Sequence, residues 1–218
     1  MVAEFGLVAK IDFLDQVRAE RLIGLVRADI GDGLAACAEA LSRGGVHCLE
    51  VAMTTPAAID TISTAAGKLP HFHFGLGTVL DVETARLGIL AGAHFIVTPS
   101  PRPQVITLCR RYHIPVISGA FSRSEIIAAH QAGANAVKVF PGDQFGPAYV
   151  SALRIEMPEV AMIPIGGVTP ATIAEFLRAG ATAAFAGDAL IEDDALSTKN
   201  WSRITERAEK FIRLIAAV

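Results

Sequence analysis

The sequence predicts an α/β fold in which eight strand–helix units close into a barrel, with an extra N-terminal helix, in a single domain spanning residues 1–218. Two observations support this prediction. Short apolar runs alternate along the whole chain with segments whose apolar residues recur at helical spacing, and the connections between them are short. Strands that alternate with helices form a parallel sheet, and eight of them can close into a (β/α)₈ or TIM barrel.

The predicted strands are apolar runs of four or five residues. They cover residues 22–26, 47–51, 72–75, 94–98, 115–118, 135–139, 161–165 and 183–186. Between them lie stretches with helical spacing. Residues 1–20 predict the extra N-terminal helix, and residues 200–218 predict a C-terminal helix.

A turn of small residues recurs before four of these strands, in RGGVHCLEV, LAGAHFIVTP, QAGANAVKVFP and RAGATAAFAG. Gly45, Gly92, Gly133 and Gly180 mark the turns at spacings of 47, 41 and 47 residues. Glycine after a helix supplies the left-handed conformation of a C-cap. The period corresponds to about two strand–helix units, as expected for a barrel. A doubly wound open sheet is the alternative architecture.

The composition is typical of such a barrel and excludes other classes of protein. Hydrophobic residues make up 52% of the chain and charged residues 19%, because parallel strands covered by helices are apolar on both faces. No apolar run predicts a transmembrane helix, and the N-terminal segment lacks the layout of a signal peptide. A net charge of −3 offers no basic surface to nucleic acid or to an anionic membrane. We expect a soluble, cytoplasmic protein whose partner is a small molecule.

The cysteines and histidines do not predict a metal site. Cys37, Cys48 and Cys109 match neither a zinc site nor a disulfide framework, and the first two lie in apolar patterns that predict buried thiols. His71 and His73 could share a strand face, but no third ligand lies near them in the sequence.

Two charged residues interrupt apolar strands near the strand ends where barrel enzymes carry their chemistry. Lys138 interrupts AVKVFP and Glu50 interrupts CLEVA. Burial lowers the pKa of an amine and makes it a nucleophile near neutral pH, and a buried carboxylate beside it can shuttle the protons that Schiff-base formation requires. The alternative for Lys138 is a lysine whose ammonium reaches out to water. The alternatives for Glu50 are a helix-capping acid and a partner in a structural salt bridge, and the pattern alone leaves all of these open.

The segment IGGVTPATI, residues 165–173, predicts a tight turn into a helix. Gly166 and Gly167 end a strand, and Thr169 is expected to be the N-cap of a helix that begins at Pro170. Free N–H groups at such a helix start bind anions, and barrels commonly hold a substrate phosphate there. A tight turn without a ligand is the alternative.

Four segments together resemble the 2-keto-3-deoxy-6-phosphogluconate (KDPG)/4-hydroxy-2-oxoglutarate aldolase family. They are GGVHCLEV, GLGTVLDVETARLGILAGAHFIVTPS, AGANAVKVFP and IGGVTPATIAEFLRAGA, and they run in family order from residue 20 to about residue 190. The resemblance implies a TIM-barrel lyase of the class I aldolase type, a homotrimer that needs neither a metal nor an organic cofactor.

The reaction that the resemblance implies is reversible cleavage of a 2-keto-3-deoxy-6-phospho sugar acid to pyruvate and glyceraldehyde 3-phosphate. Lys138 in KVFP would form the Schiff base with the C2 ketone, and Glu50 in LEV would be the general acid and base. The same chemistry on an unphosphorylated substrate such as 4-hydroxy-2-oxoglutarate is one alternative. A non-catalytic barrel that binds a phosphate ligand is another.

The resemblance also implies the residues that bind the substrate. Thr78 in GLGTV and Arg27 after the first strand would contact the pyruvate carboxylate, and Pro99 in IVTP would shape the floor of the pocket. Gly166 and Gly167 would offer backbone N–H groups to the phosphate.

The sequence departs from the family pattern in three places. Thr54 in LEVAMTT replaces an arginine of phosphogluconate-type members, and Arg27 could supply the missing charge from the other side. Ile165 replaces a threonine before the double glycine, which is similar to phosphogalactonate-type members, as is FGPAYVSAL. Gly187 and Asp188 stand where the family has glycine and a phosphate-holding serine.

Asp188 allows two interpretations. An ionised aspartate beside the phosphate site would repel a dianion. Alternatively, Asp188 could turn away and cap a short helix that begins near Ala189.

Overall fold

The computed structural model describes residues 9–218, with side chains from residue 13 onward. Its eight strands lie within two residues of their predicted positions. They are β1 (Leu22–Val26), β2 (Cys48–Ala52), β3 (His73–Gly77), β4 (Phe95–Thr98), β5 (Val116–Ala120), β6 (Ala136–Val139), β7 (Met162–Pro164) and β8 (Ala184–Ala186).

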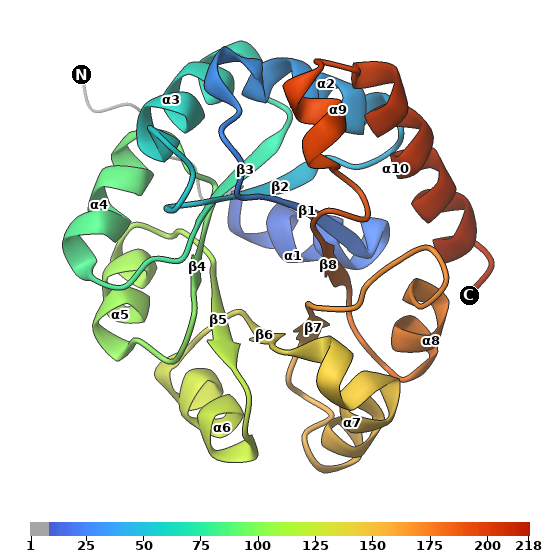
Figure 1. Ribbon diagram of the computed structural model, residues 1–218. Coiled ribbons are helices and arrows are strands. Elements are labelled where there is room, and N and C mark those ends of the chain that lie inside the picture. The colour runs from blue at the N-terminus through green and yellow to red at the C-terminus, as the bar shows by residue number, and fades with distance from the viewer. Residues whose placement is uncertain (1–8) are drawn as a thin grey trace.

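The strands form one parallel sheet in the order β7-β6-β5-β4-β3-β2-β1-β8. The two ends of this sheet meet, because the Thr182 N–H just before β8 donates a hydrogen bond of 2.8 Å to the Met162 carbonyl of β7. The sheet is therefore a barrel, as Figure 1 shows along its axis. The alternative of a doubly wound open sheet is wrong, because that fold reverses its strand order within the sheet.

Helices follow the strands and cover the outside of the barrel (Figure 1). They are α2 (Leu34–Arg43), α3 (Ala58–Lys68), α4 (Val82–Leu90), α5 (Pro103–Arg111), α6 (Arg123–Ala132), α7 (Gly142–Glu156), α8 (Ile173–Arg178), α9 (Asp193–Ser197) and α10 (Trp201–Ile215), with a 3₁₀ turn at Gly31–Gly33. The predicted C-terminal helix is α10, which starts where the Asn200 side chain accepts a hydrogen bond from the Arg203 N–H.

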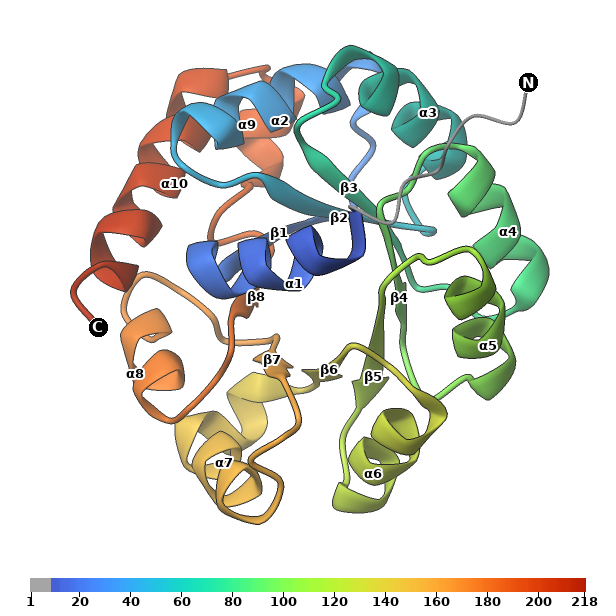
Figure 2. The same cartoon turned by 180° about the vertical axis from the view of Figure 1, so that it is seen from behind.

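The extra N-terminal helix is α1 (Ala9–Glu20), and residues 1–8 of the predicted segment lie outside the described residues. Figure 2 shows α1 lying across the end of the barrel where the strands begin. Phe13 and Val17 are fully buried there, and the Phe13 ring stacks on Phe95 with 4.7 Å between centroids. Burial of each side chain contributes about 1.5–3 kcal/mol. Helix α1 thus covers this end, and a functional site is expected at the other, where the strands finish.

The four recurring glycines adopt the predicted left-handed conformation. Gly45, Gly92, Gly133 and Gly180 have φ values of 89°, 94°, 94° and 97°. Each ends a helix and leads the chain into the next strand, so this prediction is confirmed.

Alternate strand residues face the barrel axis and form an inner core that includes Ile23, Cys48 and Phe95. Two of the inner positions of β3, Gly75 and Gly77, are glycines. A Cβ atom at Gly75 would overlap the Phe95 ring, so glycine at this position makes room for a large side chain from β4. The same device at Gly77 creates space for the site described below.

Candidate active site

Glu50 of β2 and Lys138 of β6 point into the barrel near the ends of their strands. The Lys138 Nζ donates a hydrogen bond of 2.6 Å to Glu50 Oε2 across the barrel interior. Lys138 is 8% exposed and Glu50 is 1% exposed. The lysine head therefore remains inside, bonded to the carboxylate, instead of reaching out to bulk water.

Burial lowers the pKa of Lys138 below that of an ordinary lysine, because the charged form loses its hydration. The Glu50 carboxylate opposes this shift, and the positive charge of Arg27 adds to it. The net direction is downward, so the neutral, nucleophilic amine forms at a lower pH than in an exposed lysine.

Glycine on β3 makes the position of Glu50 possible. A Cβ atom at Gly77 would overlap Oε1 of Glu50, so the carboxylate lies in the space that glycine leaves. Thr78 follows with a positive φ of 59°, which is uncommon for a residue with a side chain. Thr78 lines the same cavity as Glu50 and Lys138.

The ion pair lies in a cavity of about 310 Å³, which we call the inner cavity. It opens at the carboxyl ends of the strands, where barrel enzymes carry their active sites. Its lining brings together five of the residues predicted from the sequence with six others: Arg27, Glu50, Thr54, Thr78, Val97, Thr98, Pro99, Gly119, Lys138, Phe140 and Ile165.

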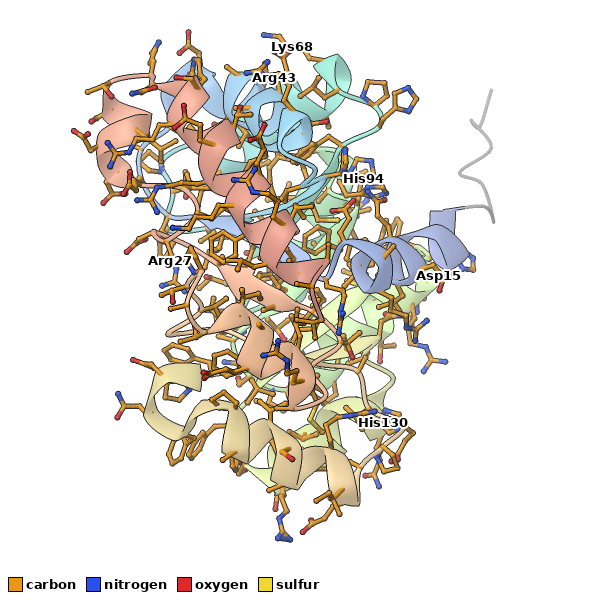
Figure 3. The ribbon with its side chains drawn as sticks, turned by 90° about the vertical axis from the view of Figure 1, so that its right-hand side faces the viewer. Asp15, Arg27, Arg43, Lys68, His94 and His130 are labelled. Carbon is orange, nitrogen blue, oxygen red and sulfur yellow. The ribbon has the colours of Figure 1, made fainter. Side chains whose placement is uncertain are left out.

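Arg27 follows β1 at the mouth of the inner cavity. In Figure 3 it lies at the opposite end of the barrel from Asp15 of α1. Its side chain is exposed, and within the described part of the chain it forms no hydrogen bond or ion pair. Arg27 is therefore available to bind an anion that enters the cavity.

A second cavity of about 270 Å³, the distal cavity, adjoins the first. Both cavities are lined by Arg27, Phe140 and Ile165, and the distal cavity also contains Gly166, Gly167, Thr169 and Asp188. Gly166 and Gly167 have φ values of 96° and 66°, which favour glycine. The eight predicted site residues thus lie in two neighbouring cavities.

The helix after the double glycine starts later than predicted. Helix α8 begins at Ile173, and residues 170–172 form a turn. The Thr172 hydroxyl accepts from the Thr169 N–H at 2.9 Å and donates to the Gly167 carbonyl at 2.6 Å. The Thr169 hydroxyl accepts a hydrogen bond from the Ala171 N–H at 3.2 Å, and its carbonyl accepts one from the Ile173 N–H at 3.0 Å, so Thr169 caps this turn. The prediction of Pro170 as the first helical residue was wrong, because the helix itself begins at Ile173 with Thr172 as its N-cap.

The capping interpretation of Asp188 was also wrong. A turn follows β8, in which the N–H groups of Leu190 and Ile191 donate to the Gly187 carbonyl, and the next helix begins only at Asp193. Asp188 is exposed, and among the residues described its carboxylate has no hydrogen bond or ion pair. It remains a free negative charge at the distal cavity.

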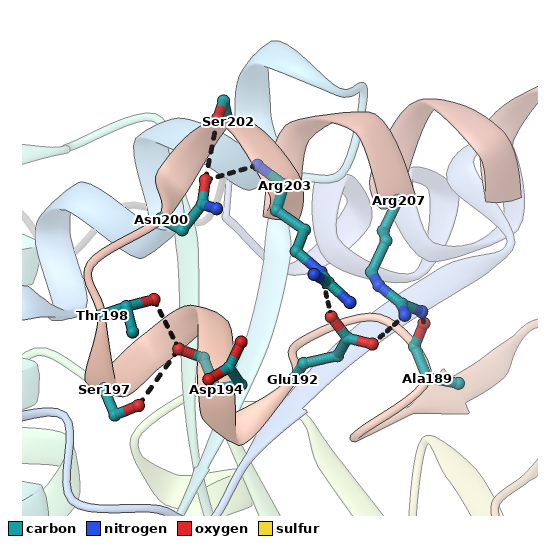
Figure 4. A network of polar contacts seen from close by, with 9 residues as sticks. All are labelled: Ala189, Glu192, Asp194, Ser197, Thr198, Asn200, Ser202, Arg203 and Arg207. Atoms are coloured by element: carbon teal, nitrogen blue, oxygen red, sulfur yellow. Dashed lines mark hydrogen bonds and ion pairs between the residues drawn. The ribbon is translucent and has the colours of Figure 1, made fainter.

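The loop after β8 is held in place by α10. Figure 4 shows Glu192 between Arg203 and Arg207, with which it forms ion pairs. Arg207 also donates to the Ala189 carbonyl at 2.7 Å. Because Ala189 follows Asp188 directly, this network limits how far the carboxylate can move away.

Residues 9–218 contain no cluster of three or more His, Cys, Asp or Glu side chains that could hold a metal ion. Cys37, Cys48 and Cys109 are free and buried. Burial raises the pKa of Cys37 and Cys109 to about 12, so these two thiols stay protonated. Over the same range, no helix has the length and apolar character needed to cross a membrane.

Comparison with known proteins agrees with this geometry. The profile of the family described as KDPG and KHG aldolase matches residues 14–207. The chain belongs to this family. A 2-dehydro-3-deoxy-phosphogluconate aldolase of Treponema pallidum is 29% identical over 213 residues, which are 97% of this chain and 100% of the relative. A 2-dehydro-3-deoxy-6-phosphogalactonate aldolase of Escherichia coli is 31% identical over 196 residues, 88% of this chain and 93% of the relative.

A solved structure from the KDPG and KHG aldolase family is similar to this chain in fold as well as in sequence. The KDPG aldolase of Legionella pneumophila, with pyruvate captured as a covalent carbinolamine intermediate, has a TM-score of 0.81 and 28% identity to this chain. The similarity covers 90% of this chain and 96% of that one. The resemblance inferred from the four sequence segments is confirmed, and so is the barrel.

Sequence analysis missed the aromatic residue Phe185, which lies beside the buried pair of Lys138 and Glu50. The Lys138 Nζ lies 4.3 Å from the centroid of the Phe185 ring, and Phe185 is 1% exposed. Counting alternate residues along β8 would have placed Phe185 on the barrel axis with Ala183 and Gly187. An apolar residue in an apolar strand gave no other signal.

Proposed function

We propose that this chain is a class I aldolase that reversibly cleaves a 2-keto-3-deoxy-6-phospho sugar acid to pyruvate and an aldehyde, glyceraldehyde 3-phosphate. The observation that carries the proposal is the buried pair of Lys138 and Glu50, 2.6 Å apart inside a cavity at the carboxyl ends of the strands. The phosphogluconate and phosphogalactonate aldolases among the relatives support the same class of substrate.

The pair supplies the two functions that the reaction requires. The neutral Lys138 amine attacks the C2 ketone, and Glu50 delivers the proton with which the hydroxyl leaves as water. Glu50, now a carboxylate, takes the proton of the C4 hydroxyl, and the electrons of the C3–C4 bond move into the iminium, so that this bond breaks to release the aldehyde and leave an enamine. Glu50 then returns a proton to C3, and water hydrolyses the iminium to pyruvate and free Lys138.

The other residues of the two cavities orient the substrate. Arg27 and Thr78 bind the carboxylate of the 2-keto acid, and Pro99 limits the depth of the inner cavity. The backbone N–H groups of Gly166 and Gly167 bind the phosphate in the distal cavity. The shared lining of the two cavities allows one extended substrate to occupy both.

A substrate panel tests the proposal. Matched phosphorylated and unphosphorylated 2-keto-3-deoxy acids, together with 4-hydroxy-2-oxoglutarate, are incubated with the enzyme, and pyruvate release is measured with a coupled assay. We expect pyruvate from the phosphorylated 2-keto-3-deoxy acid. No pyruvate from any of these acids would contradict the proposal.

Replacing Arg27 with methionine is expected to raise the KM for the 2-keto acid by roughly thirtyfold. A charged hydrogen bond between arginine and carboxylate is worth about 2 kcal/mol, and methionine retains only the apolar part of the side chain. The matched control is Arg43→Met, because Arg43 lies on α2 away from both cavities (Figure 3). An unchanged KM in Arg27→Met would mean that Arg27 does not bind the carboxylate.

Asp188→Ser is expected to improve kcat/KM selectively for phosphorylated substrates. Like charges about 5 Å apart repel by on the order of 3 kcal/mol at an effective dielectric constant near 20, which corresponds to a roughly hundredfold loss of affinity. Asp15→Ser is the control, because Asp15 lies on α1 at the far end of the barrel. An equal response of phosphorylated and unphosphorylated acids would show that Asp188 does not face the phosphate.

We further propose that the aldolase is a single-domain, cytoplasmic homotrimer. The leucines Leu80, Leu87 and Leu90 before and on α4 are each at least half exposed, which supports burial of this surface by association. Sedimentation of the native enzyme should give about three times the mass of one 22.9 kDa chain. A monomer at micromolar concentration would contradict this assembly.

A further inference from the structure

Phe185 brings an aromatic face against the nitrogen that performs the chemistry. Its ring is buried on the barrel axis, and the Lys138 Nζ lies 4.3 Å from the ring centroid. A cation at this distance from a ring face is attracted by the negative charge of the π system. The attraction is stronger where water is excluded, as it is here.

The charges around Lys138 show why this contact matters. Glu50 from β2 and Phe185 from β8 favour a positive nitrogen, whereas Arg27 after β1 disfavours it and the buried position offers little water. Within the described residues, these are the charged or aromatic groups that act on the amine. One of the two favourable partners, Glu50, changes its own charge whenever it takes up a proton.

We propose that Phe185 is a positioning residue for the aldol reaction, whose π face stabilises positive charge on the Lys138 nitrogen in both the free ammonium and the iminium. This inference rests on the proposed Schiff-base function. The ring adds to the stabilisation that the Glu50 carboxylate provides, and its contribution does not depend on the protonation of Glu50.

The covalent step can be followed atom by atom. The lone pair of the neutral Nζ forms a bond to C2 of the 2-keto acid while the C=O π electrons move to the oxygen, and transfer of one proton from Nζ to that oxygen gives a carbinolamine. A second proton, delivered by Glu50, lets that oxygen leave as water, and the nitrogen lone pair closes the C=N bond. The iminium nitrogen then carries the positive charge, close to the Phe185 ring, and Glu50, having given up its proton, is a carboxylate. The ring cannot titrate, so its stabilisation persists throughout the step.

Fluorinated phenylalanines at position 185 test this role. Replacing Phe185 with monofluoro-, difluoro- and trifluorophenylalanine withdraws π density stepwise and hardly changes the shape of the ring. Two quantities are measured: the pH profile of kcat/KM for the phosphorylated 2-keto-3-deoxy acid, and the amount of pyruvate adduct trapped by borohydride, determined by mass spectrometry.

The expected shift has a definite sign. A weaker π face destabilises the ammonium, so the pKa of Lys138 falls and the acidic limb of the profile moves to lower pH, by about one pH unit for the trifluorinated ring. Above that limb the resting amine is neutral while the iminium is still a cation. The trapped adduct at limiting pyruvate should therefore decrease by about tenfold over the series.

The matched control places the same three fluorinated phenylalanines at position 211. Phe211 is fully buried in α10, in the core between the barrel and its surrounding helices. Neither quantity should change in that series. A Phe185→Leu variant measures the loss of the ring as a whole, with its thermal unfolding recorded.

The inference would be overturned if neither the acidic limb of the kcat/KM profile nor the amount of trapped pyruvate adduct changed along the fluorine series at position 185. The ring would then only fill space. Failure of the proposed aldolase function gives a different result from failure of the Phe185 inference. In that case the enzyme with its natural Phe185 would form no pyruvate adduct.

Discussion

The Lys138→Ala variant is expected to lose cleavage activity by about 10⁴-fold or more, because it lacks the amine that, in the proposed reaction, becomes covalently attached to the substrate. Burial already lowers the pKa of this amine, and water or a surface lysine cannot replace it. Pyruvate release in the coupled assay measures the loss. Lys68→Ala is the control, since Lys68 is an exposed lysine at the end of α3 and away from both cavities.

Borohydride reduction in the presence of pyruvate should attach one three-carbon acid to Lys138 of the native enzyme. Of the lysine side chains that the structure describes, Lys138 alone is buried and lies in the inner cavity. Peptide mapping by mass spectrometry locates the adduct. An adduct on Lys68, Lys199 or Lys210, or full activity in Lys138→Ala, would remove Lys138 from the mechanism.

The alanine variant also leaves Glu50 buried without its partner. Removing one member of a buried ion pair can cost 3–5 kcal/mol in general, although a carboxyl that becomes protonated avoids part of this cost. The thermal unfolding of the variant must therefore be recorded beside its activity. A Lys138→Met/Glu50→Leu double variant removes both charges and separates loss of the nucleophile from loss of folding.

The barrel was predictable because its signals are repeated and local. Parallel strands covered on both faces are continuously apolar, and the glycines after four helices must adopt positive φ, so pattern and backbone agree. Local turns are less predictable, because several hydrogen-bond arrangements compete. The Thr172 hydroxyl bonds both Thr169 and Gly167, and this delays α8 by three residues relative to a cap at Thr169.

The pairing of Lys138 with Glu50 was predictable for a different reason. A charged side chain in a buried apolar strand is costly unless it is paired with an opposite charge. A closed barrel brings strands that are distant in sequence around one axis, where such a pair can form. The supporting residues gave no comparable signal. Gly77, which leaves room for the carboxylate, and Phe185, which faces the amine, are recognisable only once the inward-facing positions are known.

The positions of Thr54 and Arg27 agree with the proposal that Arg27 supplies the positive charge that the family resemblance leads us to expect at position 54. Both line the inner cavity, Thr54 after β2 and Arg27 after the neighbouring β1. A cation lost from one strand end can therefore be replaced from the next. This placement supports the assignment of the carboxylate contact to Arg27, which the Arg27→Met measurement decides.

The Glu50→Gln variant is expected to turn over at least about 10²-fold more slowly while it still binds pyruvate. The amide has the shape of the carboxylate and fits the space beside Gly77, but it cannot take up and release protons during dehydration and enamine protonation. The hydrogen bond to Lys138 also loses its charge. Because the Glu50 carboxylate raises the pKa of Lys138, the acidic limb of kcat/KM should move to lower pH in this variant.

Exchange of the pyruvate methyl protons with deuterium from solvent isolates the proton transfer at C3, and proton NMR follows it without any aldehyde. We expect this exchange to slow in Glu50→Gln by the same factor as cleavage. Borohydride should still trap an adduct on Lys138, because the nucleophile is intact. Glu39→Gln is the matched control, since Glu39 is exposed on α2 outside both cavities. Normal exchange and normal cleavage in Glu50→Gln would show that another group transfers the proton, and Glu50 would then be only the counterion of Lys138.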